Sequence, residues 1–525
     1  YEIYQCDWSS DVCSSDLDTG RPLGIRFGQK TEYPRDGLYL FGPVDAGTSP
    51  RPIRYGVIGT PESLRRFKEW ASKVSRYVEV PPPGKFAKST SPQHVPFPGV
   101  SEAFYAQWSN EPARTITDID EKELRRRIHI GNRHEAVKLA VDMYVERLAA
   151  EQKRSEDPPA FWYVVIPEFV YELGRPQSTV SAGEREKGSV TITAKKAAAL
   201  HIQPSLFGDA EKEAKIYQYA KDFRRQLKAR LLEHQIVIQI VRETTLTPGE
   251  FLKSNNRDLK RNVEDMATLA WKLMTGSYYK SGGRPWQLGD MRPGVCYVGL
   301  VYKKQPDHAD PSYSCCAAQM FLSDGEGVVF RGALGPWFHP EKKEYHLDRA
   351  SARRLIETVL SEYTLTHQIE PDELFIHAKS SFSDEEWTGF MEASVGKSTR
   401  IVGVQIADGK DQIKLFRPGN YPVIRGSALV VSDRSAFLWT SGYVPRLDTY
   451  MGPETPNPLQ VSIRRGDADI ETVLSDVLSL TKINFNTCLF NDREPVTIRF
   501  AEAIGDILVA APLTGEPRLP FKFYI

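Results

Sequence analysis

The chain has 525 residues, of which 41% are hydrophobic, and this length is enough for about two to four domains with substantial cores. Lysine plus arginine and aspartate plus glutamate both total 68. The net charge therefore does not indicate a nucleic-acid ligand, although basic side chains gathered on one face would suffice to bind phosphates. No apolar run approaches the length of a membrane span and no signal-peptide pattern opens the chain, so we expect a cytoplasmic protein that does not act at a membrane.

Residues 1–17 differ in character from the rest of the chain. The stretch from Cys6 to Leu17 has neither a helical nor a strand period and no core-forming run. It resembles a translated sequencing adaptor. We exclude residues 1–17 from the expected fold as a non-native segment, which leaves the authentic start of the chain open, and we treat residues 18–53 as a lead-in segment.

Strands and helices alternate over residues 54–285, which we interpret as a first domain. The hydrophobic periods predict strands at 54–58, 162–166 and 237–241, and helices at 61–77, 121–152, 222–232 and 262–273. A proline-rich insertion at 81–100 interrupts them, and the polar residues 174–196 predict a mobile surface loop. The alternation is typical of a Rossmann-like α/β domain, in which ligands bind at the carboxyl ends of the strands.

The pattern changes at about residue 286, where a second domain over residues 286–525 is expected. Closely spaced strands are predicted at 296–302, 314–322 and 327–331, followed by a helix at 347–363 and a strand at 374–377. A meander, a helix and a further strand follow one another in this order in an RNase H-like sheet. The order alone establishes only an α/β class.

Basic and amide side chains recur in a defined order within the first domain. Arg224 and Lys228 are four residues apart on a predicted helix and so share a face, and Gln239 follows on a predicted strand. Lys272 and Lys280 come later, the second just before the Gly-Gly-Arg-Pro-Trp sequence at 282–286. An isolated Arg-Lys pair on a helix is more often a solvated face. The combination favours an anion site, because each charge-assisted hydrogen bond to a phosphate contributes about 1.5–3 kcal/mol.

This order resembles the guide-end pocket of the Argonaute MID domain. Residues 297–302 and 374–377 resemble core strands of a PIWI domain, residues 34–43 resemble the segment that leads into MID in prokaryotic Argonautes, and the apolar end at 521–525 resembles the Argonaute terminus. The resemblance implies a Rossmann-like MID domain followed by an RNase H-like PIWI domain. It implies a guide 5′-phosphate site made of Arg224, Lys228, Gln239, Lys272 and Lys280, with the choice between the last two open. It also implies a structural Mg²⁺ at that phosphate, held by the terminal carboxylate of Ile525 and by Gln239.

The resemblance further implies where the metal ligands of a nuclease would lie. Two-metal cleavage requires a tight cluster of carboxylates. The corresponding positions in this chain are Val301, Lys379 and Asn486. Valine has no lone pair to offer and an ammonium group repels metal ions. We therefore expect no catalytic residues and no cleavage by this chain.

MID-like sequence begins almost at once, which leaves no room for the amino-terminal and PAZ domains of a long Argonaute, and the chain looks like a short prokaryotic Argonaute. That resemblance implies a small guide, with RNA favoured, and a complementary single-stranded DNA target. It also implies a partner with an APAZ region fused to a TIR or sirtuin-like NAD-depleting effector, in defence against plasmids or phage, with a higher oligomer on activation. Two other interpretations stay open: an active guide-directed nuclease, and a nucleotide-binding α/β protein that uses no guide.

Overall fold

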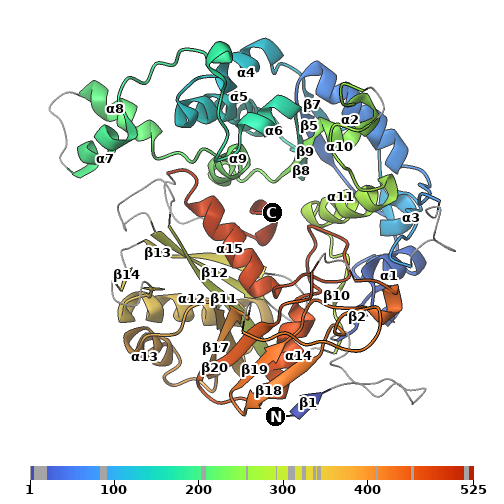
Figure 1. Ribbon diagram of the computed structural model, residues 1–525, viewed down its shortest axis with the longest axis vertical. Helices are drawn as coiled ribbons and strands as arrows, with labels where there is room; N and C mark the ends of the chain where they lie inside the picture. The colour runs from blue at the N-terminus through green and yellow to red at the C-terminus, as the bar shows by residue number, and fades with distance from the viewer. Residues whose placement is uncertain are drawn as a thin grey trace.

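Two β-sheets organise the molecule, and each is packed between helices (Figure 1). The computed structural model describes residues 2–4, 21–82, 92–202, 208–255, 258–290, 292–304, 314–321, 327–334, 338–339, 344–409, 412–450, 454–512 and 519–525. The smaller sheet has four strands and the larger has nine. The α/β class expected from the alternating periods is confirmed.

The four-stranded sheet has the order β7-β5-β8-β9 and is parallel throughout. Its strands are β5 (Tyr55–Ile58), β7 (Arg114–Ile116), β8 (Phe161–Ile166) and β9 (Ile238–Arg242). The helices of this part of the chain are α2 (Pro61–Val74), α3 (Val100–Phe104), α4 (Glu121–Ile128), α5 (Arg133–Arg154), α6 (Glu168–Leu173), α7 (Ala194–Ile202), α8 (Gly208–Ile216), α9 (Phe223–Leu232), α10 (Glu243–Leu246) and α11 (Met266–Lys280).

The central strand β8 shows how the helices cover both faces of this sheet. Tyr163 packs in a core with α2 and α11, whereas its neighbour Trp162 packs in a second core with α4, α5 and α9. Successive side chains of a strand point to opposite faces, so a strand buried on both faces must be apolar at every position. All six residues of β8 are buried. This three-layer arrangement is the Rossmann-like domain that the sequence predicts.

The nine-stranded sheet has the order β1-β18-β19-β20-β17-β16-β11-β12-β13. Its strands are β1 (Glu2–Tyr4), β11 (Val295–Lys304), β12 (Ser314–Phe321), β13 (Gly327–Leu334), β16 (Glu373–Ala378), β17 (Arg400–Asp408), β18 (Ala428–Ser432), β19 (Ser435–Leu438) and β20 (Leu459–Arg465). Strands β11, β12 and β13 form an antiparallel meander, and β16 then returns parallel to β11. This is the RNase H-like order. The pairing of β1 with β18 places residues 2–4 at the sheet edge, although the sequence led us to exclude them.

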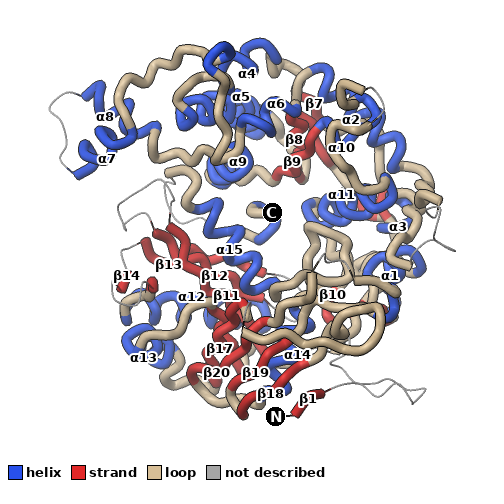
Figure 2. The backbone as a smooth tube through the Cα atoms, viewed as in Figure 1, coloured by secondary structure: helices blue, strands red, loops and turns tan. Residues whose placement is uncertain are grey.

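Four helices cover the larger sheet: α12 (Arg349–His367), α13 (Asp384–Ala393), α14 (Ile470–Leu480) and α15 (Val496–Leu508). Helices α12 and α13 share a core with one face of β11 and β16, and α14 and α15 share a core with the other. Figure 2 shows α15 lying between this sheet and the helices of the four-stranded sheet. Gly299 permits the close approach of α15, because a Cβ at this position would lie 1.8 Å from the Thr497 carbonyl oxygen.

The remaining elements are a short helix and short strands, which form three further small sheets. They are α1 (Pro34–Leu40), β2 (Leu23–Gly24), β3 (Lys30–Thr31), β4 (Arg51–Pro52), β6 (Ala106–Gln107), β10 (Gln287–Leu288), β14 (Phe338–His339) and β15 (Glu344–Tyr345). The predicted loop 174–196 is fastened to α5, because the buried Glu135 carboxylate accepts hydrogen bonds from the backbone N–H groups of Ser189 and Val190 at 2.6 and 3.3 Å. Within the described residues, no helix combines the length and apolarity needed to cross a bilayer.

Candidate functional site

A cavity of about 880 Å³ opens at the carboxyl end of β9, between α9, the loop after α6 and the end of the chain. Its position follows the rule for parallel α/β sheets, where strand ends and helix amino termini meet. The residues that line it are Ile166, Val170, Tyr171, Gly174, Arg175, Pro176, Gln177, Ser178, Asp222, Phe223, Arg224, Arg225, Lys228, Gln239, Ile240, Arg242, Asn486 and Ile525. Three of the predicted phosphate ligands and the last residue of the chain are among them.

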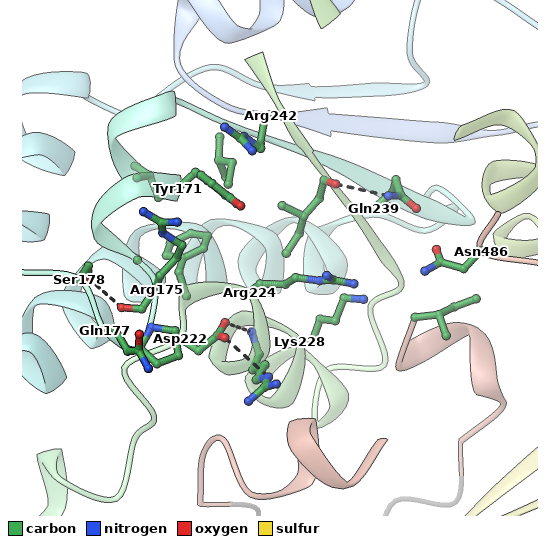
Figure 3. A pocket seen from close by; sticks show the side chains of 18 residues that line it. Tyr171, Arg175, Gln177, Ser178, Asp222, Arg224, Lys228, Gln239, Arg242 and Asn486 are labelled. Carbon is green, nitrogen blue, oxygen red and sulfur yellow. Dashed lines mark hydrogen bonds and ion pairs between the residues drawn. The ribbon is translucent and has the colours of Figure 1, made fainter. Parts of the chain in front are cut away.

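Helix α9 supplies the first two cations of the cavity. Asp222 caps its amino terminus by accepting a hydrogen bond from the Arg225 N–H at 3.0 Å, which fixes where the helix begins. Arg224 and Lys228 are one turn apart and point in the same direction, towards Gln239 and Asn486 (Figure 3). Lys228 is buried, with 4% of its surface exposed. The predicted shared face of this helix is therefore the wall of a cavity.

Strand β9 and helix α11 contribute a second pair of residues, Gln239 and Lys280. Gln239 lies on β9, and its Oε1 accepts a hydrogen bond from the Lys280 Nζ at 2.5 Å. Lys280 is the last residue of α11, which begins behind the cap Asp265 and runs two turns beyond the predicted end at residue 273. This extension buries Lys280, which is 1% exposed, beside Gln239.

Lys272, the other lysine that the sequence left open, lies elsewhere on α11. Its ammonium group pairs with the Glu264 carboxylate at 2.6 and 2.7 Å. Eight residues separate it from Lys280, and this spacing turns the two side chains to different parts of the helix surface. Of the two lysines left open by the sequence, the structure brings only Lys280 to Gln239.

The end of the chain closes the cavity on the side of the larger sheet. The Lys228 Nζ donates a hydrogen bond to the carbonyl oxygen of Tyr524 at 3.3 Å, and Ile525 lines the cavity. Phe521 anchors this terminal segment, because its ring stacks on that of Phe500 in α15 with 3.9 Å between centroids. The predicted meeting of Ile525 with the cationic residues is thus present in the structure.

Positive charge gathers at the cavity, where Lys228 and Lys280 are buried and Arg224 is exposed on the wall. Burial, together with the charges of Arg224 and Lys280, lowers the pKa of Lys228 well below its usual value. Burial and the charge of Arg224 lower the pKa of Lys280 to about 7. Both shifts have the sign expected when charged amines lose water without gaining an anionic partner. A bound anion would relieve this cost, so the arrangement is suited to hold one.

A second group of charges lies in the larger sheet, where the sequence placed the degenerate nuclease positions. Leu300 of β11 pairs with Ala378 of β16, which makes Val301 and Lys379 the next residues along these neighbouring strands. The Lys379 ammonium pairs with the carboxylates of Glu494 at 2.8 Å and Glu502 at 2.9 Å. Val301 is buried at 6% exposure.

Asn486, the third predicted degenerate position, lines the cationic cavity. A Cβ built on Gly276 of α11 would lie 3.6 Å from the Gln239 Oε1 and 4.0 Å from the Asn486 Oδ1. The residue that reaches Lys379 from this part of the chain is Glu494, just before α15, which the sequence motif did not single out.

Three solved structures of Argonautes match this arrangement of sheets and helices. Clostridium butyricum Argonaute, bound to a guide DNA and a target DNA, matches with a TM-score of 0.58 and 16% identity over 96% of this chain and 54% of that chain. The fold is that of an Argonaute. A structure of Aa-Ago with externally bound siRNA matches with a TM-score of 0.55 and 14% identity, over 98% of this chain and 56% of that one. The A. aeolicus Argonaute matches with a TM-score of 0.52 and 13% identity, over 96% and 54%.

The chain spans about half the length of these solved Argonautes. No family model and no curated protein matches the sequence. At these identities the likeness establishes the Argonaute fold, in its MID and PIWI parts, and leaves the activity to be argued from the site.

Three further residues of the MID-like cavity were missed by the sequence motif. The Arg242 guanidinium lies 3.5 Å from the centre of the Tyr171 ring and pairs with Glu168. Arg175 lines the same wall, on the loop after α6. Arg242 ends strand β9, and the rule that ligands bind at the carboxyl ends of parallel strands was the signal that would have found it.

The oxygen atoms available in the cavity determine whether it could hold a metal ion. Among the described residues, no group of three or more histidine, cysteine, aspartate or glutamate side chains is placed to hold one. Ile525, the Asp222 carboxylate and the Gln239 amide line the cavity together with Arg224 and Lys228. Mg²⁺ requires about six oxygen ligands. It therefore fits only together with an anionic ligand that brings oxygens of its own.

Proposed function

We propose that this chain binds the 5′-phosphorylated end of a small guide, with RNA favoured, and uses it to recognise complementary single-stranded DNA. The observation that carries the proposal is the meeting of Arg224, Lys228 and the end of the chain around one cavity, with the buried Lys280 hydrogen-bonded to Gln239 of its wall. Lys228 and Lys280 lose water on burial, whereas Arg224 reaches the same place from an exposed position, and together these cations match the charge of a terminal phosphate. The matched Argonaute that holds a guide and a target DNA supports the same use of the fold.

In this proposal the terminal phosphate contacts Arg224, Lys228, Gln239 and Lys280. The Ile525 carboxylate and Gln239 would hold Mg²⁺ beside the phosphate, where the ion would neutralise charge rather than activate water. The protein grips the end and the backbone of the guide, whereas base pairing supplies the sequence recognition.

We further propose that the chain does not cut its target. Val301 offers no ligand atom, and Lys379 places an ammonium group between Glu494 and Glu502, where it competes with any metal ion for these carboxylates. Cleavage by two metal ions would require the Lys379 ammonium to move away from these two carboxylates.

The effector part of the proposal rests on the resemblance to short prokaryotic Argonautes. A partner with an APAZ region and a TIR or sirtuin-like domain would deplete NAD when guide and target are both bound, as a defence against plasmids or phage. Purification of the chain with the product of its neighbouring gene, followed by an NAD assay with guide and target, tests this part separately.

The binding experiment compares short RNA and DNA guides that carry a 5′ phosphate or a 5′ hydroxyl. Filter binding is measured for the native chain and for the Lys228→Ala, Gln239→Ala double variant. We expect the native chain to prefer the phosphate by at least about tenfold, the factor that 1.4 kcal/mol supplies, and the variant to lose this preference. Equal affinity for both ends in both proteins would refute the phosphate site.

A cleavage assay distinguishes an active guide-directed nuclease from the guide-binding protein without cleavage activity that we propose. The native chain, loaded with guide, is incubated with labelled complementary DNA in Mg²⁺ or Mn²⁺. We expect the target to stay intact, and its cleavage at a fixed distance from the guide end would replace our proposal with an active guide-directed nuclease.

A further inference from the structure

The two lysines beside α15 form part of a longer row of charges of alternating sign. Lys379, at the end of β16, holds Glu494 and Glu502 at 2.8 and 2.9 Å. Lys303 of β11 lies 3.7 Å from the same Glu502 and 3.5 Å from Asp506, one turn further along α15. Each lysine therefore bridges two carboxylates.

The row continues into the four-stranded part of the molecule. Asp506 also pairs with Arg225 at 2.8 Å, and Arg225 lies next to the cavity residue Arg224. A smaller cavity of about 320 Å³, lined by Arg225, Asp506 and Arg499, adjoins the cationic cavity through residues that line both. The charged face of α15 is thus continuous with the candidate phosphate site.

The charges along this row compensate one another. Glu494, Glu502 and Asp506 place three carboxylates on and just before α15, which lies between the larger sheet and the helices of the four-stranded sheet (Figure 1). Burial alone would lower the pKa of Lys379, yet the hydrogen bonds that its ammonium donates to Glu494 and Glu502 raise it above its usual value, so the ammonium stays charged. Without the two lysines the carboxylates would repel one another, and they would repel a nucleic-acid backbone as well.

We propose that Lys303 and Lys379 are built-in counter-ions for the carboxylates of α15, and that they let a phosphodiester backbone pass this face without a bound divalent cation. A covalently attached ammonium at 2.8–2.9 Å from two carboxylates occupies the place that a hard cation would take between the same oxygens. The nucleic-acid part of this inference rests on the proposed function, whereas the counter-ion part does not.

The counter-ion role is tested without nucleic acid, by thermal unfolding of the full chain in EDTA and in millimolar Ca²⁺. The variants are Lys379→Met, the double variant Lys303→Met, Lys379→Met, and Lys379→Arg, which keeps the charge. The matched control is Lys30→Met, because Lys30 also binds a carboxylate, that of Asp290, but on an exposed surface of another sheet.

We expect the double variant to unfold at a temperature about 2 °C or more below that of the native chain in EDTA, and Ca²⁺ to restore at least half of the loss. The native chain, Lys379→Arg and Lys30→Met should not respond to Ca²⁺. A double variant that is as stable as the native chain, or a native chain that gains as much from Ca²⁺, overturns the counter-ion role.

The backbone role is tested on guide-loaded protein by its affinity for a complementary DNA strand. In EDTA, Lys379→Met should bind the strand about tenfold more weakly than the native chain, and Mg²⁺ should bring the ratio of the two affinities close to one, whatever it adds to both proteins at the guide phosphate. Equal binding by both proteins in EDTA overturns the backbone role. If the native chain binds no guide at all, the proposed function fails, and the Ca²⁺ response still decides the counter-ion role.

Discussion

The Lys228 ammonium donates a hydrogen bond to the carbonyl oxygen of Tyr524, 296 positions later in the sequence, at 3.3 Å. This contact joins helix α9 of the Rossmann-like part to the end of the RNase H-like part, at the wall of the cationic cavity. A carbonyl oxygen does not neutralise an ammonium group, and the pKa of Lys228 remains lowered by burial and by its cationic neighbours. The contact therefore positions Lys228 and leaves its charge available to a ligand.

The two lysines of α11 should behave differently when each is changed to methionine. Lys280→Met removes a buried cation beside Gln239, and we expect it to weaken binding of a 5′-phosphorylated guide by about tenfold or more. Lys272→Met removes a cation paired with Glu264 outside the cavity and should leave this affinity unchanged. Filter binding with phosphorylated guide checks both variants. If Lys272→Met lost affinity for the phosphorylated guide and Lys280→Met did not, Lys272 rather than Lys280 would be the phosphate ligand.

Binding of the phosphorylated end should weaken as the pH rises from 7 to 9. The pKa of Lys280 in the free protein is about 7, so its amine is charged below that pH and loses its proton above it. A bound phosphate favours the charged form and raises this pKa, so binding above pH 7 must take up a proton, and affinity falls with pH. The lowered pKa of Lys228 acts in the same direction.

The affinity ratio between 5′-phosphate and 5′-hydroxyl guides, measured at several pH values, isolates this effect from general loss of binding. The Lys280→Met variant, which lacks the titrating amine, should show a smaller slope across the same range. A ratio that rises with pH in the native chain would contradict the assignment.

The anchor of the terminal segment should be needed for the cavity. Phe521→Ala removes a ring that is 2% exposed and stacked on Phe500, and loss of a buried ring costs about 3–5 kcal/mol. We expect lower stability and a loss of phosphate-dependent guide binding, because Ile525 and Tyr524 lose their fixed place. Carboxypeptidase digestion, which should become faster in the variant, reports the release of the segment directly.

A substitution at Gly299 should disturb the packing of α15. In Gly299→Ala the new Cβ would meet the Thr497 carbonyl oxygen, a backbone atom that can yield only if the helix moves. We expect a loss of about 3 kcal/mol in the free energy of unfolding, measured by urea denaturation. Gly183→Ala is the control, since nothing lies within 4 Å of a Cβ built there. Equal stability of the two variants would show that α15 tolerates displacement.

The sequence by itself determined the features that depend on short-range geometry. The periods of 2 and 3.6 residues located strands β5, β8, β9, β11 and β16 and helices α2, α9 and α12 to within a few residues. The spacing of four between Arg224 and Lys228 was enough to place both on one wall, because the helix itself fixes that relation. The order of elements then gave the α/β class and its two parts.

Only the tertiary structure decided which distant residues meet. Lys272 and Lys280 lie on one helix, and their difference depends on where α11 ends and how it packs against β9. Asn486 and Glu494 are eight residues apart, and the path of the chain before α15 sends one to the cationic cavity and the other to Lys379. Such positions are set by packing between elements far apart in sequence, which local spacing does not encode.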